Sequence, residues 1–256
     1  MKATLFALRS FGRELRSGEV LVLLAAVSLA VAALTAVGFL TDRIGKAVAR
    51  QANEVLAADL RLRSQAPVPD EWREIAAEFN LQTADTLSFP SVVFHGDDNA
   101  LSSIKVVSDN YPLRGAVRVA DELFGEQREV DGIPAAGEVW ADGALLARVG
   151  ADVGDMLDIG ELHLRVSAVL TYRPDQSIGF ASLAPTVILN IADIGASGLI
   201  GEGSRVRYAL LVAGDDDDVA SFSDAISDKL PDEIRIRSQE ESSERAYNAA
   251  DRAQRF

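Results

Sequence analysis

The 256-residue chain contains no cysteine and only two histidines, and these absences exclude several classes of protein. Without cysteine there is no disulfide, no zinc–thiolate site and no cysteine nucleophile. The chain also lacks the Gly-Lys-Ser/Thr of a phosphate loop and the Gly-x-Ser-x-Gly of a serine hydrolase. The 25 Lys and Arg are outnumbered by 39 Asp and Glu, which gives a net charge of −14. So acidic a chain is not expected to bind nucleic acid.

The remaining candidates for chemistry are weak. His95 and His163 each lie in a strand-like pattern without a second ligand at metal-binding spacing, so we interpret both as ordinary surface or core residues. Asp215–Asp218 lacks the spacing of a calcium loop, and we predict that these aspartates satisfy the first amides of a helix. The glycine-rich segment Gly198–Ser204 does not lie between a strand and a helix, as a dinucleotide site would. We therefore expect a non-catalytic protein with no catalytic residue, no cofactor and no metal site.

A single long apolar run, Val20–Leu40, holds 21 residues without charge or proline. As a helix it would span roughly 31 Å, which matches the hydrocarbon core of a bilayer. A cleaved signal peptide is one alternative, with Ala36–Gly38 as the cleavage site, but the run is longer than a usual signal core. A buried core helix is the other, although such a helix rarely lacks charge over its whole length. We predict one transmembrane helix over residues 20–40.

The residues that flank this run indicate its orientation. The four basic residues that precede it are Lys2, Arg9, Arg13 and Arg16. They favour a cytoplasmic N-terminus and a periplasmic main domain, although Arg43, Lys46 and Arg50 follow the run and weaken the asymmetry. Residues 1–19 are either a short amphipathic helix on the cytoplasmic interface or an ordinary basic flank of the anchor.

Helical patterns continue on both sides of the main domain. Residues 41–60 keep an apolar stripe and predict an outgoing stalk helix. Near the other end, Ser238 and Glu241 form a capping box that begins a helix over residues 238–256. That helix has no C-terminal signal, so we expect a returning stalk that is truncated before a second transmembrane helix, with a frayed tail as the alternative.

Between the stalks, residues 61–237 predict an α+β domain. Helix-then-strand units near both ends predict a mixed α/β subdomain built from the two termini, with a β-rich insertion between them. The expected helices cover residues 70–79 and 219–230. The expected strands cover 87–95, 101–108, 156–160, 162–172, 186–190, 206–212 and 234–237, with a turn at 96–99.

Short motifs in one order along the chain resemble the MacB/FtsX-type ABC transporter permeases, and within them the YbbP-like branch. The motifs are Arg13–Glu19, Leu40–Arg43, Ala57–Leu60, Phe89–Ser91, Lys105–Val107, Tyr111–Gly115, Gly137–Trp140, Gly154–Asp155 and Gly203–Val206. One departure is Val92, where the branch tends to have methionine. The resemblance extends over essentially the whole chain, and Tyr111–Gly115 with Gly137–Trp140 is its most specific part.

The resemblance implies a permease subunit in the bacterial inner membrane, with residues 61–237 as a MacB-like periplasmic core domain. It implies a separate cytoplasmic ATPase that contacts parts of the permease beyond this chain and drives export or extraction of a hydrophobic or lipid-like substrate. The other partners that it allows are the lipid bilayer and a periplasmic protein. Tyr111 and Arg114 either shape an external loop or, as Pro112 and Gly115 favour, belong to a structural turn.

A different class of protein remains open. A single-pass membrane protein with an extracytoplasmic binding or scaffold domain would also have one anchor and one acidic domain, but no transport role. An exported hydrolase is disfavoured, because the chain has no nucleophile constellation.

Overall fold

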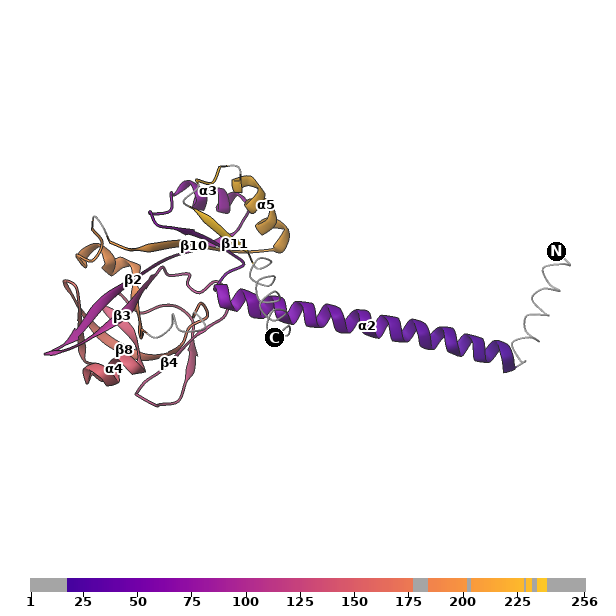
Figure 1. The fold of residues 1–256 in the computed structure, drawn as a ribbon, viewed down its shortest axis with the longest axis horizontal. Helices are drawn as coiled ribbons and strands as arrows, with labels where there is room; N and C mark the ends of the chain where they lie inside the picture. The colour runs from indigo at the N-terminus through magenta and orange to yellow at the C-terminus, as the bar shows by residue number, and fades with distance from the viewer. Residues whose placement is uncertain (1–17, 177–183, 202–203, 228, 232–233, 239–256) are drawn as a thin grey trace, which may run out of the picture. The chain divides into compact units, whose positions relative to one another are not determined.

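The computed structural model describes residues 18–176, 184–201, 204–227, 229–231 and 234–238 (Figure 1). The chain divides into two units, residues 1–49 and residues 50–256. Helix α2 (Gly18–Leu56) is continuous and belongs to both. Its apolar span, Val22–Leu40, has exposed side chains throughout. None of this uncharged span is buried within the described residues, which disfavours a core helix and agrees with a candidate membrane span.

The stalk prediction placed the end of this helix too late. Helix α2 ends at Leu56, and strand β1 (Leu60–Ser64) occupies the end of the predicted stalk. Ala57 has a positive φ of 60°, a left-handed conformation that ends a right-handed helix. Leu62 fits a helical stripe, but apolar and basic residues alternate from Leu60 to Arg63 with the two-residue period of a strand. The structure follows this second pattern.

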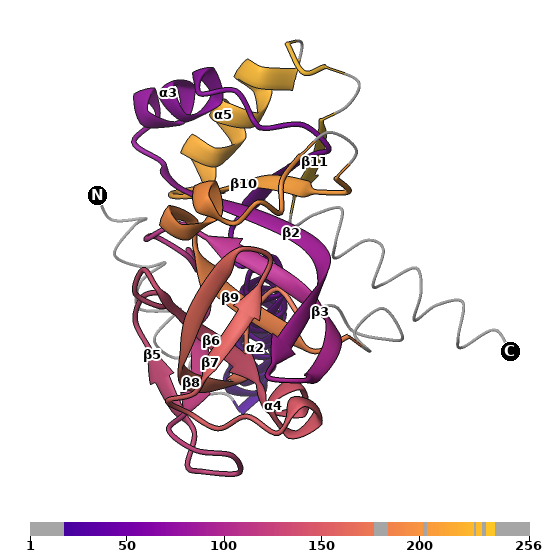
Figure 2. The ribbon, with the colours of Figure 1, turned by 90° about the vertical axis from the view of Figure 1, so that its left-hand side faces the viewer.

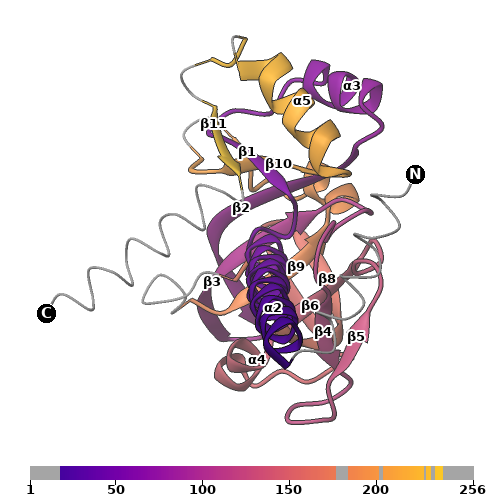
Figure 3. The same ribbon diagram turned by 90° about the vertical axis from the view of Figure 1, so that its right-hand side faces the viewer.

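The first subdomain is an antiparallel sheet with two helices on one face. Its strand order is β11–β1–β10–β2, which pairs the first described strand with the last one. The elements that complete it are α3 (Glu71–Glu78), β2 (Gln82–His95), β10 (Arg207–Ala213), α5 (Asp216–Ser227) and β11 (Arg235–Ser238). Helices α3 and α5 lie side by side on the sheet (Figures 1 and 3). Trp72, Phe222 and Ile226 pack there against Leu60 and Leu62.

The second subdomain is a closed six-stranded barrel. The ring runs β2–β3–β9–β6–β8–β7 and closes because β7 pairs with both β8 and β2 (Figure 2). Its strands besides β2 are β3 (Asp98–Val107), β6 (Glu138–Asp142), β7 (Met156–Ile159), β8 (Leu162–Tyr172) and β9 (Thr186–Asn190). Strands β4 (Val117–Ala120) and β5 (Arg128–Val130) extend the sheet beyond β8, and the short helices are α4 (Gly143–Val149) and η2 (Ile191–Ala196). Buried aliphatic side chains such as Ile104, Leu157 and Leu189 fill this part of the core.

This architecture confirms the predicted α+β fold, with an α/β subdomain from the two ends of the domain and a β-rich insertion. Strand β2 belongs to both parts, because its first half pairs with β10 and its second half with β7. The predicted turn at 96–99 was too long, since Asp98 and Asn99 pair with His95 and Phe94.

Other boundaries differ for local reasons. Helix α5 begins at Asp216 rather than at 219, because three aspartates occupy its first turn, where negative charge is favourable. The returning helix was predicted over 238–256, but Ser238 is the last residue of β11, and residues 239–256 lie outside the described residues. Residues 1–17 of the predicted segment 1–19 also lie outside them.

Candidate functional site

Polar contacts hold the chain where helix α2 ends. The carbonyl of Ala57 accepts hydrogen bonds from the backbone amides of Leu113 and Arg114, both at 3.1 Å. The Arg114 guanidinium donates to both carboxylate oxygens of Asp59, at 3.0 and 2.6 Å, and the amide of Gly214 donates to the same carboxylate at 3.1 Å. Asp59 is only 7% exposed. Two segments distant in sequence, one with Leu113 and Arg114 and the other with Gly214, are thus joined to the first residues after the helix, and we call these contacts the junction.

The segment Tyr111–Gly115 supplies one side of the junction. Its Tyr111–Pro112 peptide bond is cis, and Gly115 has a φ of 76° that only glycine adopts without strain. Tyr111 is buried, and Arg114 is held by Asp59. The burial of Tyr111 and the pairing of Arg114 favour a structural role for this motif over the shaping of an external loop.

A second site follows from the alternation of strand β1. Leu60 and Leu62 face the helices, so Arg61 and Arg63 point to the opposite face of the sheet. Strand registers extend this face across the sheet: Arg63 lies opposite Ala209, and Ser88 lies between Arg207 and Lys105. The sheet thus has an apolar face under the helices and a basic face on its other side.

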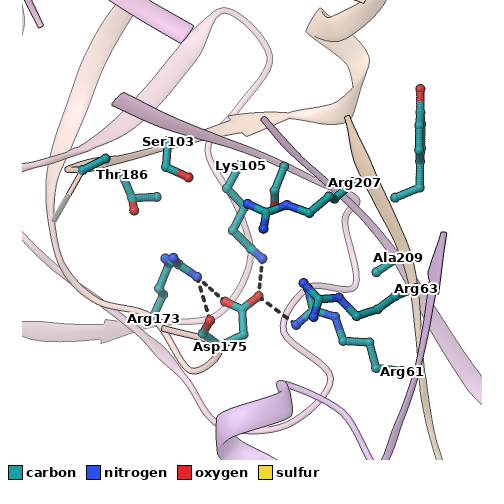
Figure 4. Close-up of a pocket in the computed structure, with 12 residues that line it drawn as sticks. Arg61, Arg63, Ser103, Lys105, Arg173, Asp175, Thr186, Arg207 and Ala209 are labelled. Atoms are coloured by element: carbon teal, nitrogen blue, oxygen red, sulfur yellow. Dashed lines mark hydrogen bonds and ion pairs between the residues drawn. The ribbon is translucent and has the colours of Figure 1, made fainter. Parts of the chain in front are cut away.

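Asp175 lies at the centre of this basic face. It follows strand β8, is 2% exposed, and accepts hydrogen bonds from Lys105, from the Tyr111 hydroxyl at 2.8 Å and from Arg173 at 2.7 Å. Arg61 lies 3.7 Å from its other oxygen. One buried carboxylate is therefore surrounded by three cations (Figure 4), and it also accepts a hydrogen bond from the phenol of Tyr111.

Burial and mutual charge shift the titration of these groups. Burial alone raises the pKa of the Asp175 carboxyl, but Lys105, Arg173 and Arg61 outweigh it and hold that pKa far below its ordinary value. Burial lowers the pKa of Lys105 to about 8, since repulsion by Arg61 and Arg173 adds to it and Asp175 offsets only part. Burial also raises the pKa of Tyr111 well above 10, so its hydroxyl remains a donor. The cluster has more positive charge than its carboxylate compensates.

A cavity of about 140 Å³ opens beside this cluster. The charged residues that line it are Arg61, Arg63, Lys105, Arg173, Asp175 and Arg207, and the hydroxyls are those of Ser88, Ser103 and Thr186. The side chains of Lys105, Arg63 and Arg207 reach toward one another from different strands (Figure 4). The Nε atom of Arg61 is buried and has no hydrogen-bond partner within the described part of the chain. We call this site the basic pocket.

Sequence reasoning identified neither Asp175 nor the pocket. The sequence pointed to Lys105 only as part of a motif, and to Arg61 and Arg63 only as residues of the domain predicted over 61–237. Two signals could have found them: a lysine inside the apolar run Ile104–Val107, and arginines that alternate with leucines in Leu60–Arg63. The contribution of Asp175, from the segment after β8, required the tertiary structure.

The other candidates lie elsewhere. His95 contacts the carbonyl of Val149 at 3.1 Å, and His163 is an exposed residue beside Asp158. Within the described ranges, no group of three His, Asp or Glu residues could hold a metal ion. The segment around Gly198 follows η2 and precedes β10, and Gly198 has a φ of 63°.

Comparison with known proteins identifies the family to which the chain belongs. Residues 20–229 match the model of the MacB-like periplasmic core domain. The chain belongs to the MacB-like periplasmic core domain family. This assignment confirms the resemblance recognised from the motifs.

One curated protein and one solved structure are similar to this chain. It is 31% identical over 249 residues to an uncharacterized ABC transporter permease, YbbP, of Escherichia coli (strain K12). That match covers 97% of this chain but only 30% of the relative, so the chain spans about a third of the permease. The extracellular domain of the noncanonical ABC-type transporter YknZ from Gram-positive bacteria matches 70% of the chain and all of that domain, with 9% identity and a TM-score of 0.45.

Proposed function

We propose that the chain is the N-terminal part of an ABC transporter permease subunit and that it transmits motion from the membrane to its periplasmic core domain. In this account a separate cytoplasmic ATPase moves the membrane helices. Helix α2 carries that motion to the core domain, which exports or extracts a hydrophobic or lipid-like substrate. The chain itself performs no catalysis.

The observation that carries the proposal is the continuity of helix α2 with the junction. The helix is uninterrupted from Gly18 to Leu56 and contains the membrane span. Directly after it, the Ala57 carbonyl and the Asp59 carboxylate are bound by Leu113, Arg114 and Gly214. A displacement of the helix end therefore acts on two segments of the domain together rather than on a flexible linker.

The proposed orientation rests on charge. The basic flank before the span places residues 1–19 in the cytoplasm and residues 61–237 in the periplasm of a bacterial inner membrane. The ATPase would contact parts of the permease beyond this chain, and residues 41–60 and 238–256 would be the outgoing and returning connections. The bilayer surrounds the span, and a periplasmic protein is a further proposed partner.

The experiment uses the full-length permease, purified from its native host with a tag. We expect an ABC ATPase to co-purify with it and, in nanodiscs, to release a fluorescent fatty-acyl lipid when ATP is added. A Gly-Gly-Ser-Gly insertion between Leu56 and Ala57 keeps every junction contact but adds flexible chain. This variant should retain ATP hydrolysis and lose lipid release.

The matched control carries the same insertion in the exposed turn at Gly96–Asp97, far in sequence from the junction. It should release lipid as the unaltered permease does. Absence of any ATPase partner would contradict the permease assignment and favour the anchored scaffold domain. Full lipid release by the junction insertion would contradict the mechanical role of helix α2.

A further inference from the structure

We propose that the basic pocket is a binding site for a phosphate group, carried either by a lipid headgroup or by a soluble phosphate compound. The site is formed by strands β1, β10, β2, β3 and β9 together with the segment after β8. Phosphate binding at this site can be tested on this chain alone, whether or not the proposed transport role is correct.

The first argument is the sign of the charge. Five basic side chains and one carboxylate line the cavity, although the chain as a whole has a net charge of −14. The single negative charge of Asp175 neutralises one positive charge, but three cations surround this carboxylate. Positive charge gathered in one hollow of an acidic protein attracts an anion, because the low-dielectric walls concentrate its field.

The second argument is the supply of hydrogen-bond donors. Arg207 makes no ion pair with a residue that the structure describes, and the buried Nε of Arg61 has no acceptor. A buried donor without an acceptor costs free energy, which an anion in the cavity would recover.

The third argument is the kind of anion. Arginine guanidinium groups bind phosphate oxygens in pairs, and the hydroxyls of Ser88, Ser103 and Thr186 add neutral donors around the same cavity. A carboxylate offers one charge and two oxygens, fewer than these donors can bind. The cavity of about 140 Å³ is far larger than the 10–15 Å³ that holds one water, so it accommodates a phosphate group.

The test titrates the detergent-solubilised chain with inorganic phosphate, with dihexanoyl phosphatidylglycerol and with chloride at equal ionic strength, by isothermal calorimetry. We expect saturable binding of at least one phosphate compound and none of chloride. The Arg207→Gln variant, which breaks no ion pair among the described residues, should weaken binding on the order of tenfold, the value of one charge-assisted hydrogen bond. Arg148→Gln, an equal change of charge on the exposed surface of α4, should leave the affinity unchanged.

The two probes separate the sources. Tighter binding of phosphatidylglycerol than of inorganic phosphate assigns the pocket to a lipid headgroup, and equal or weaker binding assigns it to soluble phosphate. The proposal is overturned if neither probe binds saturably, if chloride binds as well as phosphate, or if Arg148→Gln weakens binding as much as Arg207→Gln does.

Discussion

Arg114 holds Asp59 through two hydrogen bonds of 3.0 and 2.6 Å, although 55 residues separate them in sequence. Asp59 is the third residue after helix α2 ends, so this pair ties the start of the core domain to the Tyr111–Gly115 segment. Asp59 is nearly buried, and burying a charged carboxylate costs free energy. The ion pair with Arg114 and the hydrogen bond from the amide of Gly214 offset that cost.

Replacing Arg114 by alanine should therefore destabilise the domain. We expect a loss of about 2–3 kcal/mol in the free energy of unfolding, since hydrogen bonds to a largely buried carboxylate disappear. Thermal unfolding of the detergent-solubilised chain measures it, with Arg128→Ala as control, because the Arg128–Asp121 pair is exposed and should contribute at most about 1 kcal/mol. Equal losses in the two variants would show that the junction is an ordinary surface contact.

The Asp175 cluster should be sensitive to loss of the one carboxylate that the described residues supply to it. Asp175→Asn leaves Lys105, Arg173 and Arg61 close together without their counter-charge, and breaking a buried pair in this way costs about 3–5 kcal/mol. The additional substitution Lys105→Met removes one of the unpaired charges and should restore part of the loss in a double-mutant cycle. Strictly additive losses would contradict a direct interaction between these two residues.

The shifted pKa of Lys105 gives a pH dependence of known sign. In the folded chain the pKa of Lys105 is lowered to about 8, whereas the pKa of an ordinary solvated lysine is 10.5. Between these values the unfolded chain binds more protons, so Lys105 makes the free energy of unfolding rise with pH. The groups that face its ammonium are Asp175, Arg61, Arg173 and Tyr111.

The measurement is the unfolding free energy of the unaltered chain minus that of Lys105→Met. We expect this difference to increase from about pH 7.5 to about pH 9.5, within the window between the two pKa values. A constant or falling difference would mean that Lys105 keeps its proton in the folded chain.

The orientation can be tested with single cysteines, because the chain has none of its own. Asp97→Cys places a thiol in the exposed turn between β2 and β3, and Ser10→Cys places one before the span. In intact spheroplasts a membrane-impermeant maleimide should label the first variant and spare the second, which reacts only after lysis. The reverse pattern would put the core domain in the cytoplasm.

The fold was largely predictable where one pattern dominated a segment. The apolar run of Val20–Leu40 and the helix of Trp72 and Ala76 each have one consistent period, and the structure confirms both as helical. Strand β1 was missed because Leu62 fits a helical stripe as well as an alternating one. Barrel closure was not predictable, since the pairing of β7 with β2 joins residues more than sixty positions apart.

The candidate site was less predictable than the fold. Arg61, Lys105, Arg173 and Asp175 come from three distant parts of the chain and carry no common motif. Their meeting depends on strand register, which a single sequence does not specify. The Tyr111–Gly115 segment was recognised as a turn from Pro112 and Gly115, but its partner Asp59 could be found only in three dimensions.

The most direct test of the account measures whether ATP moves the core domain. The full-length permease with its ATPase is placed in nanodiscs, with a donor dye on Asp97→Cys and acceptor dyes on the lipid headgroups. We predict that ATP changes the energy transfer, and that the flexible insertion between Leu56 and Ala57 abolishes this change while ATP hydrolysis continues. An unchanged signal in the unaltered permease, or the same change with the insertion, would contradict transmission through helix α2.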